Sequence, residues 1–166
     1  MGIKEVMLPE FDHEMGTTRK LLERVPWNDA SWKPHPKSMS LGELAGHLAE
    51  MPGWVGTIMQ DSSFDMVSGG DGRATFGSTK ELLAAFDQSV AKARAAIAAR
   101  TDAEMMAPWT LKKAGEDLFT VPKVGVLRTF LLNHVIHHRG QLSVYLRLRD
   151  VPVPSIYGPS ADEKAL

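Results

Sequence analysis

Apolar residues recur every three or four positions in four long segments of this 166-residue chain. That spacing is typical of helices with one buried face, and no comparable run alternates between apolar and polar residues as a half-buried strand does. The pattern therefore predicts an all-α fold with a four-helix bundle. The expected helices cover residues 9–25, 40–60, 78–100 and 122–149.

Several segments begin with a Ser or Thr followed three residues later by Glu. This spacing is the capping box, in which the two residues satisfy each other's backbone donors at the start of a helix. Three pairs have it: Ser40 with Glu43, Ser78 with Glu81, and Thr101 with Glu104. The first two support the starts of the second and third long helices, and the last predicts a brief helical start.

Prolines and turn-forming residues predict where the helices bend or stop. Pro9 suits the first turn of the first helix. Pro52 removes a backbone hydrogen bond inside the second helix, so we expect a kink near Leu48. Residues 61–77 are rich in turn formers and predict a long crossover between the second and third helices. Residues 101–121 continue, after the brief helical start, into a turn or short hairpin over one end of the bundle.

Charge and composition exclude several classes of protein. Nineteen Lys and Arg residues against twenty Asp and Glu give a formal net charge of −1, without a basic run for binding phosphates, so nucleic acid is not an expected partner. The chain has no cysteine, so any metal site must use His, Asp or Glu. Charged residues and histidines interrupt the most apolar stretch, which argues against a membrane span.

The length and the N-terminal sequence bear on organisation and location. A chain of 166 residues has the usual size of one compact domain, so we expect residues 1–166 to form a single domain. The first residues, MGIKEVMLPEFDHE, lack the apolar run and cleavage site of a signal peptide. A cytoplasmic location is therefore expected.

Three histidines carry the strongest chemical signal. His134 and His138 lie one turn apart on the buried face of the last predicted helix, where both imidazoles can reach one cation. His47 shares the buried face of the second helix with Trp54, so packing of the two helices would bring the three rings together. The alternative is that each ring donates to a backbone carbonyl. Burying three imidazoles without a common partner costs about 1–3 kcal/mol per unsatisfied group, which favours a metal site with positions open for water or substrate.

Other residues are weaker candidates for the site. Glu50, one turn beyond the histidine of the second helix, is a candidate base or orienting group, with a solvated surface position as the alternative. Gln141 and Tyr145 follow the histidine pair on the same face and are candidate catalytic residues that line a pocket, with core packing as the alternative. His137 is expected beside the metal site, in a dimer contact or at the surface. Arg139 points nearly opposite the histidines, which argues against direct catalysis.

The strings GHLAEMPGW in the second helix and NHVIHHRGQLSVYLRLRDVPVPSIYG in the fourth helix and its tail resemble the DinB/YfiT-like superfamily. The resemblance covers almost the whole chain. It implies an up-down-down-up four-helix bundle with a long crossover between helices two and three, often assembled as a homodimer. It also implies one divalent ion, nickel or zinc, bound by His47, His134 and His138, the positions that match the family's motif.

Characterised relatives in that superfamily include thiol-dependent transferases and isomerases that use bacillithiol, mycothiol or glutathione, and others are described as metal-dependent hydrolases. The resemblance therefore predicts a metal-dependent enzyme that activates water or a thiol for hydrolysis or thiol transfer on a small molecule, with a low-molecular-weight thiol as candidate cosubstrate. Two alternatives stay open: a non-catalytic metal-binding stress protein and a helical dimerisation module.

Overall fold

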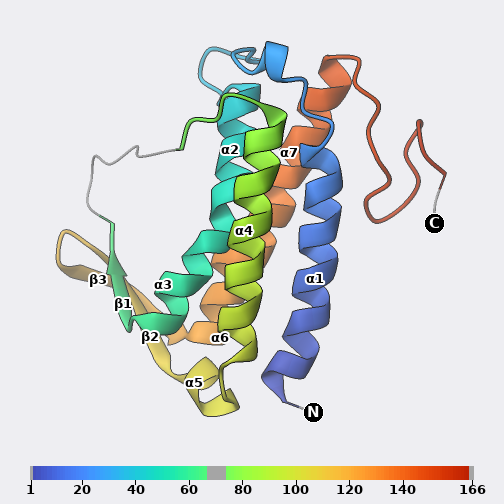
Figure 1. Cartoon of the computed structure of the whole chain (residues 1–166). Helices are drawn as coiled ribbons and strands as arrows, with labels where there is room; N and C mark the ends of the chain where they lie inside the picture. The colour runs from blue at the N-terminus through green and yellow to red at the C-terminus, as the bar shows by residue number, and fades with distance from the viewer. Residues whose placement is uncertain (1, 67–73, 165–166) are drawn as a thin grey trace.

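The computed structural model describes residues 2–66 and 74–164. Long helices lie side by side, and a small sheet lies beside one of them (Figure 1). The helical elements that run along the bundle are α1 (Ile3–Leu22), α2 (Leu41–Glu50), α3 (Trp54–Gln60), α4 (Thr79–Ala98), α6 (Lys123–Val126), the π-helical η3 (Leu127–Asn133) and α7 (His134–Leu148). Short helical turns form η1 (Trp27–Asp29), η2 (Met51–Gly53) and α5 (Asp102–Met106).

The helices enclose one apolar core. The chain ascends along α1, descends along α2 and α3, descends again along α4 and ascends along α6 and α7 (Figure 1). Both α1 and α2 pack against α4 and α7. Each of the four contributes fully buried side chains, among them Phe11, Leu44, Phe86 and Leu142. Within the described residues, no helix is both long enough and apolar enough to cross a membrane.

The all-α expectation is wrong in part, because the structure contains a three-stranded sheet in the order β1-β2-β3. Strand β2 (Pro108–Lys113) and strand β3 (Glu116–Pro122) form the hairpin considered for residues 101–121, and β1 (Ser63–Asp65) pairs with β2 in parallel. Ala114 and Gly115 connect the hairpin with φ angles of 51° and 84°. Such left-handed conformations at both central residues suit the twist of a tight hairpin.

The first two helices differ from their predicted bounds. Helix α1 begins at Ile3, six residues before the predicted start, because the carboxylate of Asp102 accepts the Ile3 backbone N–H at 2.9 Å. Pro9 therefore lies inside the helix. The expected kink near Leu48 is also misplaced, since Leu48 remains within α2 and the break occurs at η2, the 3₁₀ turn that contains Pro52. A proline fits the start of such a turn, where no intrahelical donor is lost.

Two of the three expected capping boxes are complete. They are Ser40 with Glu43 at α2 and Thr101 with Glu104 at α5. At α4, Ser78 accepts the Glu81 backbone N–H as expected, but the Glu81 carboxylate accepts from Gly77 rather than from Ser78. The helix start was thus predicted correctly, and one of its two hydrogen bonds is displaced by one residue.

The last predicted helix forms one helical run from Lys123 to Leu148, with a π-helical segment in its first half. A π segment accommodates an extra residue per turn and often occurs at functional sites. Here η3 ends directly before His134. Of the expected crossover over 61–77, residues 67–73 lie outside the described residues.

Candidate metal centre

Three histidines converge between α2 and α7. His47 comes from α2, and His134 and His138 come from α7. One ring nitrogen from each lies within 4.8 Å of the other two. The ring centroid of His47 lies 5.3 Å from that of His134 and 4.7 Å from that of His138. The ring centroids of His134 and His138 are 4.6 Å apart. The structure thus brings together the three histidines predicted as ligands, while metal binding by them stays a prediction.

Local helix geometry explains this convergence. A separation of four residues places His134 and His138 one turn apart on the same face of α7. On α2, His47 is flanked by the fully buried Leu44 and Leu48, which hold that helix against the core. Because α2 packs directly on α7, the His47 ring meets the histidine pair.

Hydrogen bonds indicate which ring nitrogens of the histidines carry protons. The Nδ1 atom of His138 lies 2.7 Å from the side-chain oxygen of Gln141, and this oxygen only accepts, so Nδ1–H is the donor. The Nε2 lone pair of a neutral His138 then faces Nε2 of His134 at 2.8 Å. Burial lowers the pKa of His134 and nearby His138 lowers it further, against an opposing backbone hydrogen bond to Phe130. Two such nitrogens need a shared proton or a cation between them, so the donor set fits a divalent transition metal.

Two further aromatic rings border the cluster. The ring of Trp54 lies 5.7 Å from that of His47 and 5.5 Å from that of His134. The helical spacing in the sequence placed Trp54 on the same buried face as His47, but an ordinary core residue has the same spacing. The exposed His137 lies with its ring 4.9 Å from that of His138 and nearly perpendicular to it, so it neighbours the cluster from the solvent side.

The weaker candidates occupy three different environments. Glu50 is half-buried, and its carboxylate accepts the backbone N–H of Ala74. Gln141 contacts a histidine of the cluster directly, as described above. The Tyr145 hydroxyl donates to the backbone carbonyl of Met39 at 3.2 Å, and its ring packs edge-on against Trp32. Gln141 is thus in contact with the cluster, and catalysis by any of the three stays a prediction.

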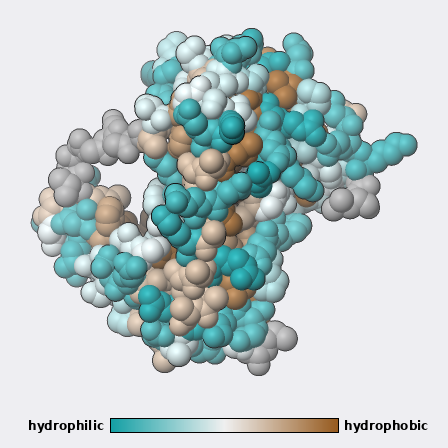
Figure 2. Space-filling view, viewed as in Figure 1, coloured by the Kyte–Doolittle hydropathy of each residue, from teal (hydrophilic) through white to brown (hydrophobic). Residues whose placement is uncertain are grey.

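A cavity of about 360 Å³ adjoins the histidine cluster. It lies between the small sheet and the helices α3, η3 and α7, and His134 lines it. Its walls include Trp54 and Ile58 of α3, Trp109 and Leu111 of β2, and Phe130 of η3. In Figure 2, the region of the sheet on the left of the molecule shows apolar side chains among hydrophilic ones. The sheet therefore forms one wall of the space next to the candidate metal centre, and of its strands the sequence predicted the hairpin but not β1.

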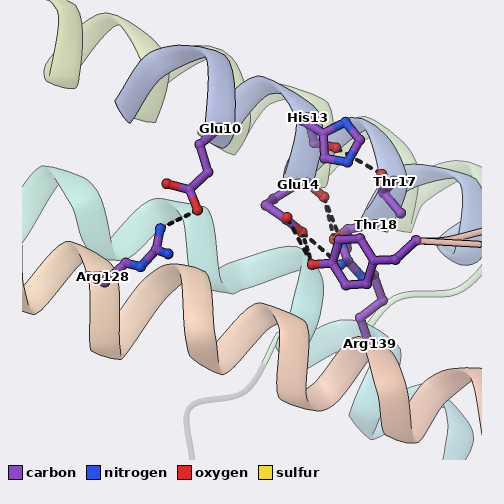
Figure 3. Close-up of polar contacts among 8 residues, drawn as sticks. Glu10, His13, Glu14, Thr17, Thr18, Arg128 and Arg139 are labelled. Carbon is purple, nitrogen blue, oxygen red and sulfur yellow. Dashed lines mark hydrogen bonds and ion pairs between the residues drawn. The ribbon is translucent and has the colours of Figure 1, made fainter. Parts of the chain in front are cut away.

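Arg139, the residue after His138, points away from the cluster toward α1, as expected (Figure 3). Its guanidinium pairs with the Glu14 carboxylate at 2.7 Å, and both side chains are almost completely buried. The Tyr157 hydroxyl donates to Glu14 at 2.8 Å and accepts from Arg139 at 2.6 Å. Sequence reasoning missed this buried network, because nothing in the local pattern of α7 identifies a partner 125 residues away.

Three comparisons with known proteins yield one relative in sequence, similar solved structures and a family. A match to a protein of Bacillus subtilis (strain 168), "Uncharacterized protein YrdA", has 49% identity over 41 residues, a quarter of each chain. The crystal structure of a DinB-like protein from Bacillus cereus ATCC 10987 covers 92% of this chain and 97% of its own, with a TM-score of 0.73 and 21% identity. The DinB-like protein YjoA from Bacillus subtilis covers 90% and 96%, with a TM-score of 0.68 and 22% identity. At these identities the two structures establish a shared fold. The model of the DinB superfamily matches residues 10–142, so this chain belongs to the DinB superfamily.

Proposed function

We propose that this protein is a metal-dependent enzyme in which His47, His134 and His138 hold one divalent ion, nickel or zinc. The observation that carries the proposal is the convergence of three imidazole nitrogens within 4.8 Å from two helices. The reaction is hydrolysis or thiol transfer on a small molecule, with a low-molecular-weight thiol as cosubstrate in the second case.

A bound divalent cation lowers the pKa of a water or thiol that it coordinates, which supplies a nucleophile near neutral pH. The protein's part is to hold the three nitrogens and to admit a substrate. Gln141 fixes the orientation of His138, and the half-buried His134 borders the cavity. A purely structural metal site is closed by its protein ligands, whereas three ligands beside a cavity suit catalysis. The cavity thus supports an enzyme over a non-catalytic metal-binding protein.

Metal content tests the ligand assignment. We expect purified protein to retain close to one equivalent of nickel or zinc after dialysis, measured by elemental analysis. The His138→Ala variant should lose that metal while keeping its helical circular dichroism. His137→Ala is the matched control, because it removes the adjacent exposed imidazole and should leave the metal content unchanged. Equal metal content in the His138→Ala and wild-type proteins would contradict the proposal.

Activity distinguishes the two reaction classes. The metal-loaded protein should be assayed against a panel of esters and amides, and against electrophiles offered together with bacillithiol, mycothiol or glutathione. Turnover that requires an added thiol identifies thiol transfer, and turnover without a thiol identifies hydrolysis. In either case the activity should disappear in His138→Ala and persist in His137→Ala. A metal-loaded protein that turns over none of these compounds, with or without a thiol, would favour the non-catalytic alternative.

A further inference from the structure

The cavity beside His134 has an almost entirely apolar lining. Thr57 and His134 contribute polar side chains to this lining, and aromatic or aliphatic side chains form the other walls. Among the residues that the structure describes, no Lys, Arg, Asp or Glu lines it. A charged ligand group would lose its hydration there without gaining an ionic partner, which is costly. The lining therefore selects a neutral, apolar group.

The size of the cavity limits what that group can be. An engineered apolar cavity of about 150 Å³ in another protein accommodates benzene. At about 360 Å³, this cavity has room for a group about twice that size, such as a bicyclic aromatic ring or a branched aliphatic chain. Small ligand sites in proteins commonly start near this volume.

One residue joins the cavity to the histidine cluster. Trp54 lines the cavity and also lies 5.7 Å from the ring of His47 and 5.5 Å from the ring of His134. A ligand that fills the cavity is thus held against His134 and against Trp54, whose ring borders His47. The opposite wall comes from the sheet, where Phe64 of β1 and Leu111 of β2 line the space. Phe64 is 48% exposed within the part of the chain that the structure describes.

We infer that this cavity binds the apolar portion of the substrate, an aromatic or branched aliphatic group of about ten carbons, and presents the attached polar group to the histidine centre. The inference rests on the proposed function, because it assigns the substrate class of the same site. It also assigns different positions to the two substrates of a thiol transfer. The apolar electrophile occupies the cavity, and a charged thiol approaches the centre from outside it.

Three hydroxamic acids test the assignment, because they share one metal-binding group and differ in the apolar tail. We expect zinc-loaded protein to bind 2-naphthohydroxamic acid at least about tenfold more tightly than acetohydroxamic acid, with benzohydroxamic acid between them, in calorimetric titrations. Equal affinity for all three compounds would overturn the inference while leaving the metal site intact.

Matched variants test whether the apolar tail of these compounds occupies the cavity. Thr57→Asp places a carboxylate in the cavity and should reduce the naphthyl preference to about twofold or less, whereas the size-matched Thr57→Val should keep it. Phe64→Ala should also reduce the preference, and Leu118→Ala, which removes another exposed side chain of the same sheet, should not. A naphthyl preference that survives both Thr57→Asp and Phe64→Ala would overturn the assignment.

A metal-independent probe separates this inference from the proposed function. 2-Naphthamide carries the same ring without the metal-binding group and can be titrated into metal-free protein by tryptophan fluorescence. Binding that Thr57→Asp weakens at least about fivefold supports the cavity assignment even if wild-type protein fails to bind zinc, a failure that would count against the proposed function alone. No binding of 2-naphthamide at millimolar concentration, or binding unaffected by Thr57→Asp, would contradict the cavity assignment.

Discussion

The side-chain oxygen of Gln141 accepts a hydrogen bond from Nδ1 of His138 at 2.7 Å, one turn along the same helix. This contact fixes the tautomer of His138 and leaves Nε2 facing the other histidines. Gln141 is exposed, and it affects the cluster through its hydrogen bond to the ring of His138. We therefore predict that Gln141 positions the ring of His138, while the catalytic role expected from the sequence stays a prediction.

Gln141→Ala should therefore weaken metal binding by about 10- to 100-fold, because the ring of His138 loses the partner that orients it. The affinity can be measured by competition with a chromophoric chelator. Gln141→Glu keeps an acceptor at the same place and should restore most of the affinity. Val144→Ala, at another exposed position of α7, should have no effect. A Gln141→Ala protein with wild-type metal affinity would show that the contact does not orient the ligand.

The candidate metal centre was predictable because it depends on short-range geometry. The four-residue spacing of His134 and His138 fixes their relative position through helix periodicity alone. The capping box that begins at Ser40 and the apolar stripe of α2 were enough to place His47 on the inner face. Packing of two helices then completes the cluster, and bundles offer few ways to arrange such inner faces.

The cavity next to the centre was not predictable from the same information. Its outer wall depends on β1, three residues long, which pairs in parallel with a strand 47 residues further along the chain. A three-residue strand is too short to show alternation, and the sequence gives no signal for its partner. The π-helical η3 and the Glu14–Arg139 pair were missed for a related reason, since tertiary packing rather than local propensity determines them.

The buried pair between Glu14 and Arg139 should be highly sensitive to loss of one partner. Arg139→Met leaves the Glu14 carboxylate buried without its guanidinium, and we expect the free energy of unfolding to fall by about 3–5 kcal/mol in urea titrations. The double variant Glu14→Met, Arg139→Met removes both charges and should recover much of that loss. A double variant less stable than the single one would show that the pair itself stabilises the fold.

A neighbouring ion pair provides the control for this experiment. Arg128 and Glu10 also join the last helix to α1, and Figure 3 shows the two pairs on the same pair of helices. The Arg128–Glu10 pair is partly exposed, so Arg128→Ala should change the free energy of unfolding by less than about 1 kcal/mol. Similar losses for Arg128→Ala and Arg139→Met would contradict the argument from burial.

The cap of α2 should contribute to the stability of the helix that carries His47. Ser40 accepts the Glu43 backbone N–H at 3.1 Å, and Glu43 accepts the Ser40 N–H at 2.6 Å. Ser40→Ala removes one of these bonds and should lower the free energy of unfolding by about 1 kcal/mol. Ser38→Ala, in the preceding loop, is the control and should have little effect. Equal stability of the Ser40→Ala and wild-type proteins would show that the loop, rather than the cap, fixes the start of α2.

Tyr157 should make stability depend on alkaline pH. Tyr157 is 63% exposed as a residue, but its hydroxyl reaches the buried pair, and this partial burial raises the pKa of the hydroxyl above the usual value of 10.0. The hydrogen bond to Glu14 raises the pKa further, although Arg139 acts in the opposite direction. A tyrosine whose pKa is raised on folding contributes stability that is fully present below the unfolded pKa and is lost as pH rises through the folded pKa.

We expect wild-type protein to exceed Tyr157→Phe in stability by about 1 kcal/mol at pH 8, since the variant lacks the hydroxyl. This difference should shrink steadily above pH 10 in urea unfolding. A stability difference between the two proteins that stays constant from pH 8 to pH 11 would mean that ionisation of the Tyr157 hydroxyl is not coupled to folding.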